Sequence, residues 1–389
     1  MITVIGYDGS PLSQLAQDRL ASATLVVGGA RHLAAVRTDA TTYEMGDVAK
    51  AVQLLSECDG DAVVLASGDP GFFGITRRLV AEGLSAEVLP APSSVAQAFA
   101  RLELPWDDAV VVSAHGRPLR PALNVLRRFP KVAVLTDRST GPAAIVRELG
   151  SACPQLVVFE RLGEVDERIT HLDDPTQAEA HEWREPNLVV ALRPDERAGG
   201  QPWLAGAPPR QGWALSDDAF EHRDGMVSKP EVRALALARL APSVGQLAWD
   251  VGAGSGSVAV ECSRLGSAVV AVERNAEDCA RIARNALAHD APVQVVEGSA
   301  PEALDGLPEP DAVFVGGGGP DVVAAVAARR PQRVVVTLAQ LERVAPTVAA
   351  LSSYDVESVL LQASRLAPLA DGHRLVPANP VFVLSGVLR

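Results

Sequence analysis

The chain has 389 residues, of which 48% are hydrophobic and 21% are charged, and its formal net charge at pH 7 is −13. This length has room for two packed domains, and the composition excludes disordered and fibrous proteins. A mean hydropathy of +0.13, with no apolar run of about 18 residues, excludes a membrane-spanning helix. The acidic total also argues against a nucleic-acid partner, because it repels phosphate.

The amino terminus and the cysteines indicate the compartment. Residues 2–5, Ile-Thr-Val-Ile, are typical of a strand, and no basic segment or cleavable apolar stretch precedes them. We therefore expect no signal peptide and a cytoplasmic protein. No two cysteines form a CxxC pair, so we expect neither a disulfide framework nor a zinc site. Four buried, reduced thiols are expected instead, at Cys58, Cys153, Cys262 and Cys279.

The first half alternates β-branched runs with helix-length segments. Helices are expected over Pro11–Ala21 and Phe72–Glu82. Strands are expected over Thr24–Val27, Ala62–Leu65, Val110–Val112, Val132–Leu135, Leu156–Phe159 and Leu188–Leu192. This alternation predicts an α/β domain with a parallel or mixed sheet.

Residues 195–210 are rich in glycine and proline and have no apolar period, which is typical of an interdomain connection. We expect a first domain over residues 1–195, a linker over 196–211 and a second domain over 212–389. The second domain has predicted helices at Pro230–Leu240, Ser257–Leu265, Ala276–His289, Asp321–Arg329 and Gln340–Leu351. Its predicted strands are Leu247–Val251, Ala268–Val272, Val293–Val296, Ala312–Val315, Arg333–Leu338, Val356–Leu361 and Val381–Leu384. The order predicts a doubly wound, Rossmann-like parallel sheet with a late antiparallel excursion.

A glycine-rich loop in the second domain predicts a nucleoside ligand. The strand before it leads into Gly252-Ala-Gly-Ser-Gly256, directly before a helix. Glycines let the backbone approach a ligand closely, and the helix N-terminus offers free N–H groups. Glu273 ends the next strand about 20 positions later, where a carboxylate accepts hydrogen bonds from ribose hydroxyls. Loop and acid together favour a nucleoside site over a structural turn.

This pattern resembles the class I S-adenosylmethionine-dependent methyltransferases. The resemblance implies donor contacts from Gly252, Ala253, Gly254, Ser255, Gly256 and Glu273, and adenine contacts from Ser299 and Ala300. Glu302 is expected to begin a helix rather than to act as a catalyst, since acids favour first turns.

Three further segments narrow the resemblance: Met226–Arg233, Phe314–Gly319 and Asn379–Val383. Together they look like the decarboxylating methyltransferase family of cobalamin biosynthesis, which methylates C15 of a precorrin and removes CO2 from the C12 acetate. The resemblance implies that the Ser228 hydroxyl lies near the methyl donor, and we expect macrocycle contacts from Lys229 and Arg374. For His373 we favour an exposed loop histidine over a proton shuttle.

The first domain carries the motif LASGDPGFFG over residues 65–74. Taken alone, it predicts a tight turn with Asp69 capping the following helix. With Val88–Val95, His115–Arg117, Leu135–Asp137, Glu160–Gly163 and Pro186–Val190, it resembles the class III tetrapyrrole methyltransferases, and most closely their precorrin C5 members. The resemblance implies a donor site between two α/β lobes, formed by Ser67, Gly68, Asp69, Phe72, Ser93, Ser94, Leu162 and Asn187.

One loop departs from this family. Where the family has Gly-x-Gly-Pro-Gly, Gly6-Tyr-Asp-Gly-Ser10 keeps only the first glycine in register, which concerns the placement of the macrocycle more than that of the donor. A polycarboxylate substrate needs basic anchors, because arginine holds a carboxylate with two hydrogen bonds. His115 and Arg117 are favoured because they follow a strand within a motif. The full set of candidates is Arg31, His32, Arg77, Arg78, Arg101, His115, Arg117 and Arg120.

The two resemblances together imply methylation of precorrin-6B at C5 and C15 with decarboxylation of the C12 acetate, giving precorrin-8. The methyl donor would be S-adenosylmethionine, without a metal, and the candidate catalytic residues are Lys229, Arg374 and His115. One alternative is the same chemistry on a cobalt-containing ring. Another is an RNA or protein methyltransferase with a non-catalytic first domain, which the acidic charge and the missing Asn-Pro-Pro-Tyr motif disfavour. Family precedent implies a homo-oligomer formed through the second domain, with no nucleic-acid or membrane partner.

Overall fold

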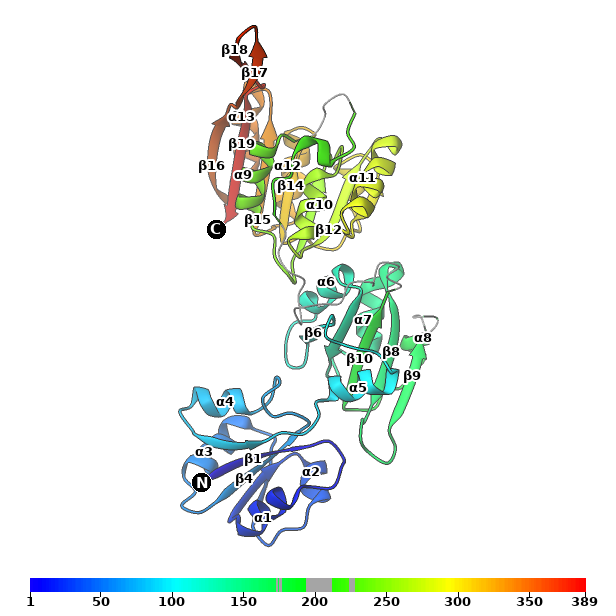
Figure 1. The fold of residues 1–389 in the computed structure, drawn as a ribbon, viewed down its shortest axis with the longest axis vertical. Coiled ribbons are helices and arrows are strands. Elements are labelled where there is room, and N and C mark those ends of the chain that lie inside the picture. The colour runs from blue at the N-terminus through cyan, green and yellow to red at the C-terminus, as the bar shows by residue number, and fades with distance from the viewer. Residues whose placement is uncertain (173, 175–176, 194–211, 224–227) are drawn as a thin grey trace. The chain divides into compact units, whose positions relative to one another are not determined.

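The computed structural model describes residues 1–172, 174, 177–193, 212–223 and 228–389. Backbone contacts divide the chain into two compact units, residues 1–119 with 130–207 and residues 120–129 with 208–389. Each unit is built from mixed helices and strands (Figure 1). The predicted linker over 196–211 lies outside the described residues.

The first unit contains an all-parallel sheet with strand order β3-β2-β4-β1-β5. Alternate residues of its strands enter separate cores, Val4 and Val64 on one face and Ile5 and Leu65 on the other. Both faces are therefore apolar, as is expected for a buried parallel sheet. Its elements are β1 (Ile2–Tyr7), α1 (Gln14–Ser22), β2 (Leu25–Gly28), α2 (Ala30–Ala35), β3 (Thr41–Glu44), α3 (Val48–Ser56), β4 (Ala62–Ser67), α4 (Thr76–Ala81) and β5 (Ala86–Leu89).

A second sheet of the first unit is mixed, with order β6-β7-β10-β8-β9. Only β6 and β7 run parallel; β10 is antiparallel to both β7 and β8, and β8 is antiparallel to β9. The two sheets confirm the prediction of parallel or mixed α/β structure. This part comprises α5 (Ser94–Leu102), β6 (Val110–Ser113), α6 (Arg120–Arg128, grouped with the second unit), β7 (Lys131–Leu135), α7 (Pro142–Leu149), β8 (Gln155–Glu160), β9 (Arg168–Leu172), α8 (Gln177–Ala180) and β10 (Asn187–Leu192).

The second unit has a seven-stranded sheet in the order β13-β12-β11-β14-β15-β19-β16. Strands β11 to β15 are parallel, and β19 runs antiparallel between β15 and β16, which confirms the predicted doubly wound sheet with a late antiparallel excursion. Helices α9, α10 and α11 cover one face and α12 and α13 the other. The elements are α9 (Pro230–Leu240), β11 (Leu247–Val251), α10 (Ser257–Arg264), β12 (Ala268–Glu273), α11 (Ala276–Ala288), β13 (Gln294–Glu297), β14 (Ala312–Val315), α12 (Pro320–Ala328), β15 (Arg333–Leu338), α13 (Val344–Ala350), β16 (Tyr354–Leu361) and β19 (Val381–Leu388).

Two predicted helices are shorter than expected. The helix predicted over Phe72–Glu82 begins only at Thr76, because the preceding segment holds Gly71, Gly74 and the left-handed Phe73. The helix predicted over Gln340–Leu351 is a 3₁₀ turn, Leu341–Arg343, followed by α13. Proline lacks a backbone N–H, so Pro346 is accommodated in the first turn of α13.

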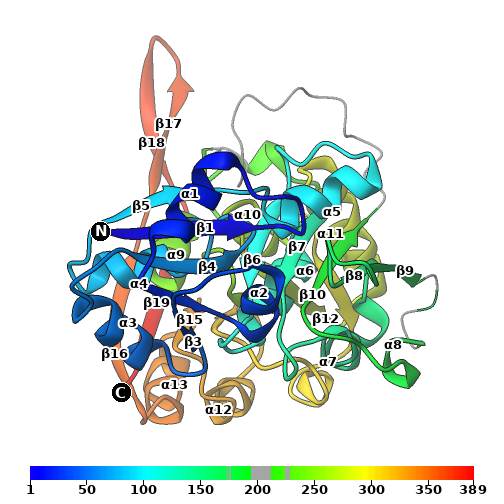
Figure 2. The same cartoon turned by 90° about the horizontal axis from the view of Figure 1, so that it is seen from below.

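The sequence did not predict a β-hairpin formed by β17 (Ser364–Leu369) and β18 (Gly372–Pro377). These strands pair only with each other in the described chain, and they extend away from the rest of their unit (Figures 1 and 2). Their periodicity was hidden by Pro368 and Pro377, because proline argues against a strand.

Two further features qualify the sequence predictions. All four cysteines are free thiols, but only Cys262 and Cys279 are buried; Cys58 and Cys153 are half-buried, so that part of the prediction was wrong. In the part of the chain that the structure describes, no helix is both long enough and apolar enough to cross a bilayer.

Candidate active sites

Three loops of the first unit meet at the carboxyl edge of its parallel sheet, after β1, β4 and β5. A Cβ atom on Gly6 would lie 2.2 Å from the carbonyl oxygen of Gly68 and 2.6 Å from the nitrogen of Ala91, so only glycine fits there. The chain leaves β1 and β4 toward opposite sides of the sheet, and such a switch point is where open α/β sheets bind ligands. The structure thus brings together the predicted donor residues Ser67, Gly68, Asp69, Ser93 and Ser94.

Two of these side chains are already engaged in local structure. The Oδ1 atom of Asp69 accepts a hydrogen bond of 2.8 Å from the backbone N–H of Gly71. It closes the turn and does not cap α4, whose N-cap residue is Ile75, so the predicted capping of that helix was wrong. The Ser93 hydroxyl caps α5 by accepting from the N–H of Ala96. Gly68, at φ = +55°, donates its N–H to the carbonyl of Tyr7.

The loop that departs from the family pattern makes a close contact with the loop after β8. Gly9 has φ = +92°, and a Cβ there would lie 1.8 Å from the carbonyl oxygen of Gly163. Gly163 is equally constrained, because a Cβ atom there would lie 1.9 Å from the carbonyl oxygen of Asp8. The second glycine of the loop therefore serves close packing beside Leu162. Leu162 and Phe72, both predicted donor contacts, pack against one apolar core.

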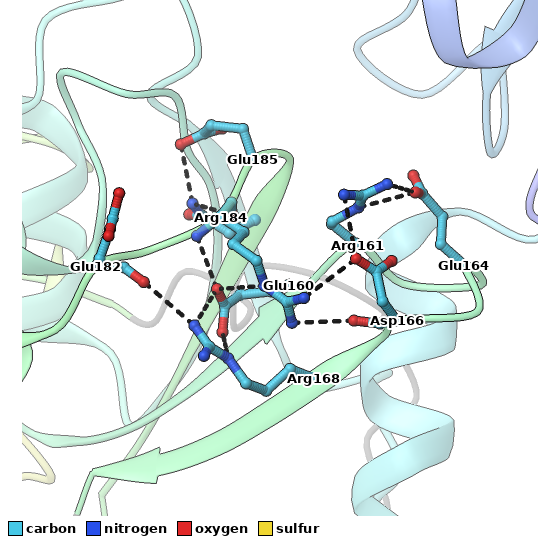
Figure 3. Close-up of polar contacts among 9 residues, drawn as sticks. Glu160, Arg161, Glu164, Asp166, Arg168, Glu182, Arg184 and Glu185 are labelled. Carbon is cyan, nitrogen blue, oxygen red and sulfur yellow. Dashed lines mark hydrogen bonds and ion pairs between the residues drawn. The ribbon is translucent and has the colours of Figure 1, made fainter.

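A buried carboxylate, Glu160, lies between the side chains of Arg168 and Arg184 (Figure 3). Its side chain has no exposed surface and is paired with Arg168. It also accepts a 2.7 Å hydrogen bond from the backbone N–H of Arg184. Burial alone would raise the pKa of Glu160, but the hydrogen bonds from Arg168 and Arg184 outweigh it and lower that pKa. The network joins the 160–168 loop to the segment that leads into Asn187.

Asn187 is a predicted donor contact whose side chain is largely occupied. Its Oδ1 accepts from the Thr136 hydroxyl at 2.6 Å, and its Nδ2 donates to the Arg184 carbonyl and the Glu185 carboxylate. Residue 187 is opposite Glu160 in the sheet, so Asn187 and Leu162 lie at the same strand ends. The backbone is engaged as well, because the carbonyls of Asn187 and Pro186 accept from the Thr136 hydroxyl and the Arg161 N–H.

Of the basic residues predicted to anchor the substrate, some contact the donor loops and others are paired or exposed elsewhere. Arg31 donates to the Ser67 hydroxyl at 2.6 Å and pairs with Glu164 at 2.8 Å, which places it at the donor loops. Arg117 donates to Ser113 and lies 5.7 Å above the Phe73 ring. Three others form ion pairs, Arg78 with Glu82, Arg101 with Glu167, and Arg120 with Asp311 of the same second unit. Arg77 is exposed on α4.

His115 lies on an ordered loop. Its Nδ1 is 3.1 Å from the carbonyl oxygen of Thr136, so this nitrogen carries the hydrogen and Nε2 is left as an acceptor. The next residue, Gly116, donates its N–H to Asp137 at 2.6 Å. That bond and those from Ser139 hold the pKa of Asp137 well below its ordinary value.

In the second unit, two of the three glycines of the glycine loop have no room for a Cβ atom, and the third has open space beside it. A Cβ on Gly252 would lie 2.8 Å from the nitrogen of Gly317, and one on Gly256 would lie 2.9 Å from Ile282. Gly254, at φ = +54°, has no atom within 4 Å of such a Cβ. The loop is thus closed toward the protein and open above Gly254, which is the space a bound nucleoside needs.

Two acids hold this loop. Glu273 accepts from the N–H of Gly254 at 2.9 Å and from that of Asn275 at 3.0 Å, a structural role beside the predicted ribose contact. Asp250, which the sequence analysis did not single out, accepts from the N–H of Ala259 in α10. Complete burial raises the pKa of Asp250 to about 7. Its position at a strand end before the glycines was the available signal.

The segments after β13 and before α9 complete this region. Gly298 donates its N–H to the carbonyl of Glu273, so Ser299 and Ala300 follow beside that acid. Glu302 begins a short 3₁₀ helix, as predicted. The ammonium of Lys229 pairs with Asp217 at 2.8 Å. Ser228 is fixed by its carbonyl, which accepts from the buried guanidinium of Arg233.

Arg374 and His373 lie on the exposed strand β18. Among the described residues, no hydrogen bond or ion pair joins Arg374 to Lys229 or to the glycine loop, so the structure does not bring these candidates together. No group of three histidine, cysteine, aspartate or glutamate side chains in that part of the chain is arranged to hold a metal ion.

Comparison with known proteins identifies both halves of the chain. A family model described as tetrapyrrole (corrin/porphyrin) methylases matches residues 6–174, and one described as a precorrin methyltransferase domain matches residues 218–387. A Sinorhizobium protein named precorrin-6Y C(5,15)-methyltransferase [decarboxylating] is 39% identical over 333 residues, 81% of this chain and 77% of that protein. The chain belongs to this family.

Other members and half-length relatives agree. A Mycobacterium tuberculosis protein of the same name is 35% identical over 82% of this chain and 80% of its own length. A Salmonella typhimurium cobalt-precorrin-7 C(5)-methyltransferase is 34% identical over 51% of this chain and all of its own length. The family suggested by the motifs is confirmed, and so are the α/β fold class and the assignment as a methyltransferase. The individual donor and substrate residues stay predictions.

Proposed function

We propose that this chain transfers methyl groups from S-adenosylmethionine to C5 and C15 of precorrin-6B and removes CO2 from the C12 acetate, giving precorrin-8 in cobalamin biosynthesis. One observation carries the proposal: relatives named for both methylations match about four fifths of the chain. We assign C5 to a domain over residues 1–195 and C15 with decarboxylation to a domain over 212–389. The family matches over 6–174 and 218–387 support this division.

The second unit has the features that an S-adenosylmethionine site requires. The open position above Gly254, the Glu273 carboxylate and the N-terminus of α10 suit a nucleoside with a charged amino-acid tail. When bound, the donor supplies an electrophilic methyl group on a positively charged sulfur. Residues 252–256, Glu273, Ser299 and Ala300 would hold it, with the Ser228 hydroxyl beside the methyl.

In the first unit the loops after β1, β4 and β5 supply the corresponding site. Ser67, Gly68 and Asp69 would hold the donor from one side, with Ser93 and Ser94 from the α5 end. Phe72 and Leu162 would supply an apolar wall, and Asn187 would contact the donor from the second sheet after exchanging one of its present hydrogen bonds. Arg31 and Arg117, both beside these loops, would bind substrate carboxylates.

The chemistry asks mainly for positioning. A ring carbon conjugated with pyrrole nitrogens is already nucleophilic, so holding it in line with the methyl group supplies much of the rate. Apolar walls exclude water from the reacting atoms. For decarboxylation, the conjugated ring accepts the electron pair that the departing CO2 leaves. Lys229 would orient the macrocycle after release from Asp217.

We propose the metal-free ring as substrate. A cobalt-ring relative, the Salmonella C5 enzyme, spans only about half of this chain, whereas relatives named for the precorrin-6Y reaction span both halves. We further propose a cytoplasmic enzyme.

We also propose a homo-oligomer formed through β17 and β18. Leu366 and Leu375 are directly opposite each other in the hairpin and are 71% and 65% exposed. A two-stranded ribbon alone is marginally stable in water, so a covering surface is expected. A second copy of the hairpin offers the same apolar pair and would provide that surface.

The decisive experiment incubates the purified chain with precorrin-6B and S-adenosylmethionine and reads the product mass. We expect two added methyl groups and loss of CO2. Gly68→Ala would press on Pro92 and Ser93 and should remove only the C5 methylation. Gly252→Ala would press on Gly317 and should remove only the C15 methylation and decarboxylation. A wild-type product lacking either methyl would contradict the proposal.

A further inference from the structure

His32 is a buried histidine behind the donor loops of the first unit. It lies in α2 with 7% of its surface exposed, and its Nε2 is 3.3 Å from the hydroxyl of Ser67. Its Nδ1 is also buried and has no hydrogen-bond partner among the described residues. Ser67, by contrast, ends β4 and is exposed at the predicted donor site. Ser67 therefore connects a buried imidazole to the surface where the substrate is expected.

The direction of the hydrogen bonds in this cluster is set by Arg31. Its guanidinium has only donors, so it donates to the Ser67 oxygen, at 2.6 Å. The hydroxyl hydrogen is then free to point to Nε2 of His32, which makes Nε2 the acceptor and leaves the ring hydrogen on Nδ1. In the resting arrangement Arg31 donates to Ser67 and Ser67 donates to His32, so the chain of hydrogen bonds ends on the basic Nε2.

The surroundings keep this imidazole neutral. Burial, and after it the positive charge of Arg31, lower the pKa of His32 to about 4 against the opposing charge of Glu164. The ring of Tyr7 is the other neighbour, edge-on at 6.1 Å. A neutral imidazole can accept a proton, and this environment then favours its release.

The proposed C5 methylation has to dispose of a proton. A bridging carbon of a tetrapyrrole bears one hydrogen, and transfer of a methyl group from a sulfonium adds one positive charge to the ring system. Loss of that hydrogen as a proton restores both the charge and the conjugation. Among the groups at the donor loops, Ser67 has a basic nitrogen behind its hydroxyl, Nε2 of His32 at 3.3 Å.

We propose that Ser67 and His32 form a proton relay for the C5 methylation, an inference that rests on the proposed function. After the carbon–methyl bond has formed, the bond between that carbon and its hydrogen breaks, and its electron pair returns to the ring. The Ser67 oxygen takes the proton and passes its own hydrogen to Nε2 of His32. Once the product has left, the proton on Nε2 returns through the exposed Ser67 hydroxyl to solvent. Arg31 stabilises the serine oxygen in between, beside the contact with a substrate carboxylate proposed for it above.

The test uses substrate deuterated at C5 and a variant that keeps the hydrogen bond. In His32→Gln the amide oxygen still accepts from Ser67 but is not basic. We expect a loss of about 10²-fold or more in the single-turnover rate of C5 methylation. We also expect a primary deuterium isotope effect that is larger than in the wild type. Ser67→Ala should behave alike, and Ser67→Thr should recover most of the rate.

The same chain supplies the controls. C15 methylation and CO2 release report on the intact second unit, and titration calorimetry reports on donor binding. Wild type that adds no methyl at C5 contradicts the proposed function itself. If the wild type methylates C5 and His32→Gln does so at the same rate, the relay is overturned. A C5-methylated product that retains the deuterium also overturns it. A rate loss in His32→Gln matched by an equal loss of donor affinity overturns it too, because that indicates a structural role.

Discussion

At the scale of single residues, both candidate sites depend on glycines. At some of these positions a Cβ atom would collide with the protein, and at one the space beside the backbone is open. Gly6, Gly9 and Gly163 allow three loops of the first unit to approach within backbone contact. In sequence, the change after Gly6 is a departure from the family pattern. The structure assigns Gly9 a packing role instead, which depends on a loop more than 150 residues away and was not visible in the sequence.

Gly254 differs from these glycines because the space beside it is open. Gly254→Ala should fold, at a cost of about 1 kcal/mol for the left-handed backbone. Its methyl group would occupy the predicted donor space, so we expect the apparent KM for S-adenosylmethionine in C15 methylation to rise about tenfold. C5 methylation should be unchanged. Gly306→Ala, at φ = +75° with equally open space, is the matched control.

Asp250 predicts a pH dependence of stability. Its folded-state pKa of about 7 lies above the value of an unfolded aspartate, so the native state holds the proton more tightly. The free energy of unfolding should therefore fall as the pH rises from about 4 to about 7 and then level off. Asp250→Asn keeps an acceptor for the Ala259 N–H, and its free energy of unfolding should change less between about pH 4 and pH 7.

Urea unfolding at pH 5 and pH 8, followed by tryptophan fluorescence, measures the effect. The control is Asp355→Asn, which replaces an exposed aspartate paired with Arg389. This variant should show the same change in the free energy of unfolding with pH as the wild type. An unaltered slope in Asp250→Asn would show that another group titrates.

At the scale of elements, a buried ion pair ties the segment before α9 to α9 and α10. The side chains of Arg233 and Glu261 have no exposed surface and approach to 2.5 Å. Glu261 accepts from the backbone N–H groups of Ala214 and Leu215, and Arg233 donates to the carbonyls of Leu215 and Ser228. The two charges neutralise each other, and the contact with the Ser228 carbonyl positions the residue next to Lys229.

Glu261→Gln would leave the Arg233 charge buried without a counterion. We expect a loss of about 3 kcal/mol or more in the free energy of unfolding. The exposed pair of Arg239 and Glu357 provides the comparison, and Glu357→Gln should cost about 1 kcal/mol or less. Denaturant unfolding of both variants measures the difference, and equal losses would refute the role assigned to burial.

At the scale of the whole molecule, the chain combines two α/β units with different sheet orders, each with its own predicted donor site. The second unit also carries the exposed hairpin. In the described chain the strands of that hairpin pair only with each other, and its Leu366 and Leu375 are exposed. The proposed oligomer thus concerns the second unit and leaves the first free of that requirement.

The double variant Leu366→Ser with Leu375→Ser should shift the protein to a smaller assembly, because it removes the exposed apolar pair. Sedimentation velocity at several protein concentrations measures the change. Leu287→Ser removes a leucine of α11 that is 65% exposed and should leave the assembly as it is. A wild type that is already monomeric would contradict the proposed interface.

The sequence alone determined the order of elements in the second unit, with α9, β11, β14 and β15 at the predicted bounds, because apolar periodicity and glycine placement are local signals. It also determined the family, since the motifs lie within short stretches. Only the tertiary structure decided that Asp250 and Glu273 hold the glycine loop and that Lys229 pairs with Asp217. It also brought His32 behind Ser67. These contacts join residues 9 to 35 positions apart, and their energy comes from burial and charge, which a linear pattern does not record.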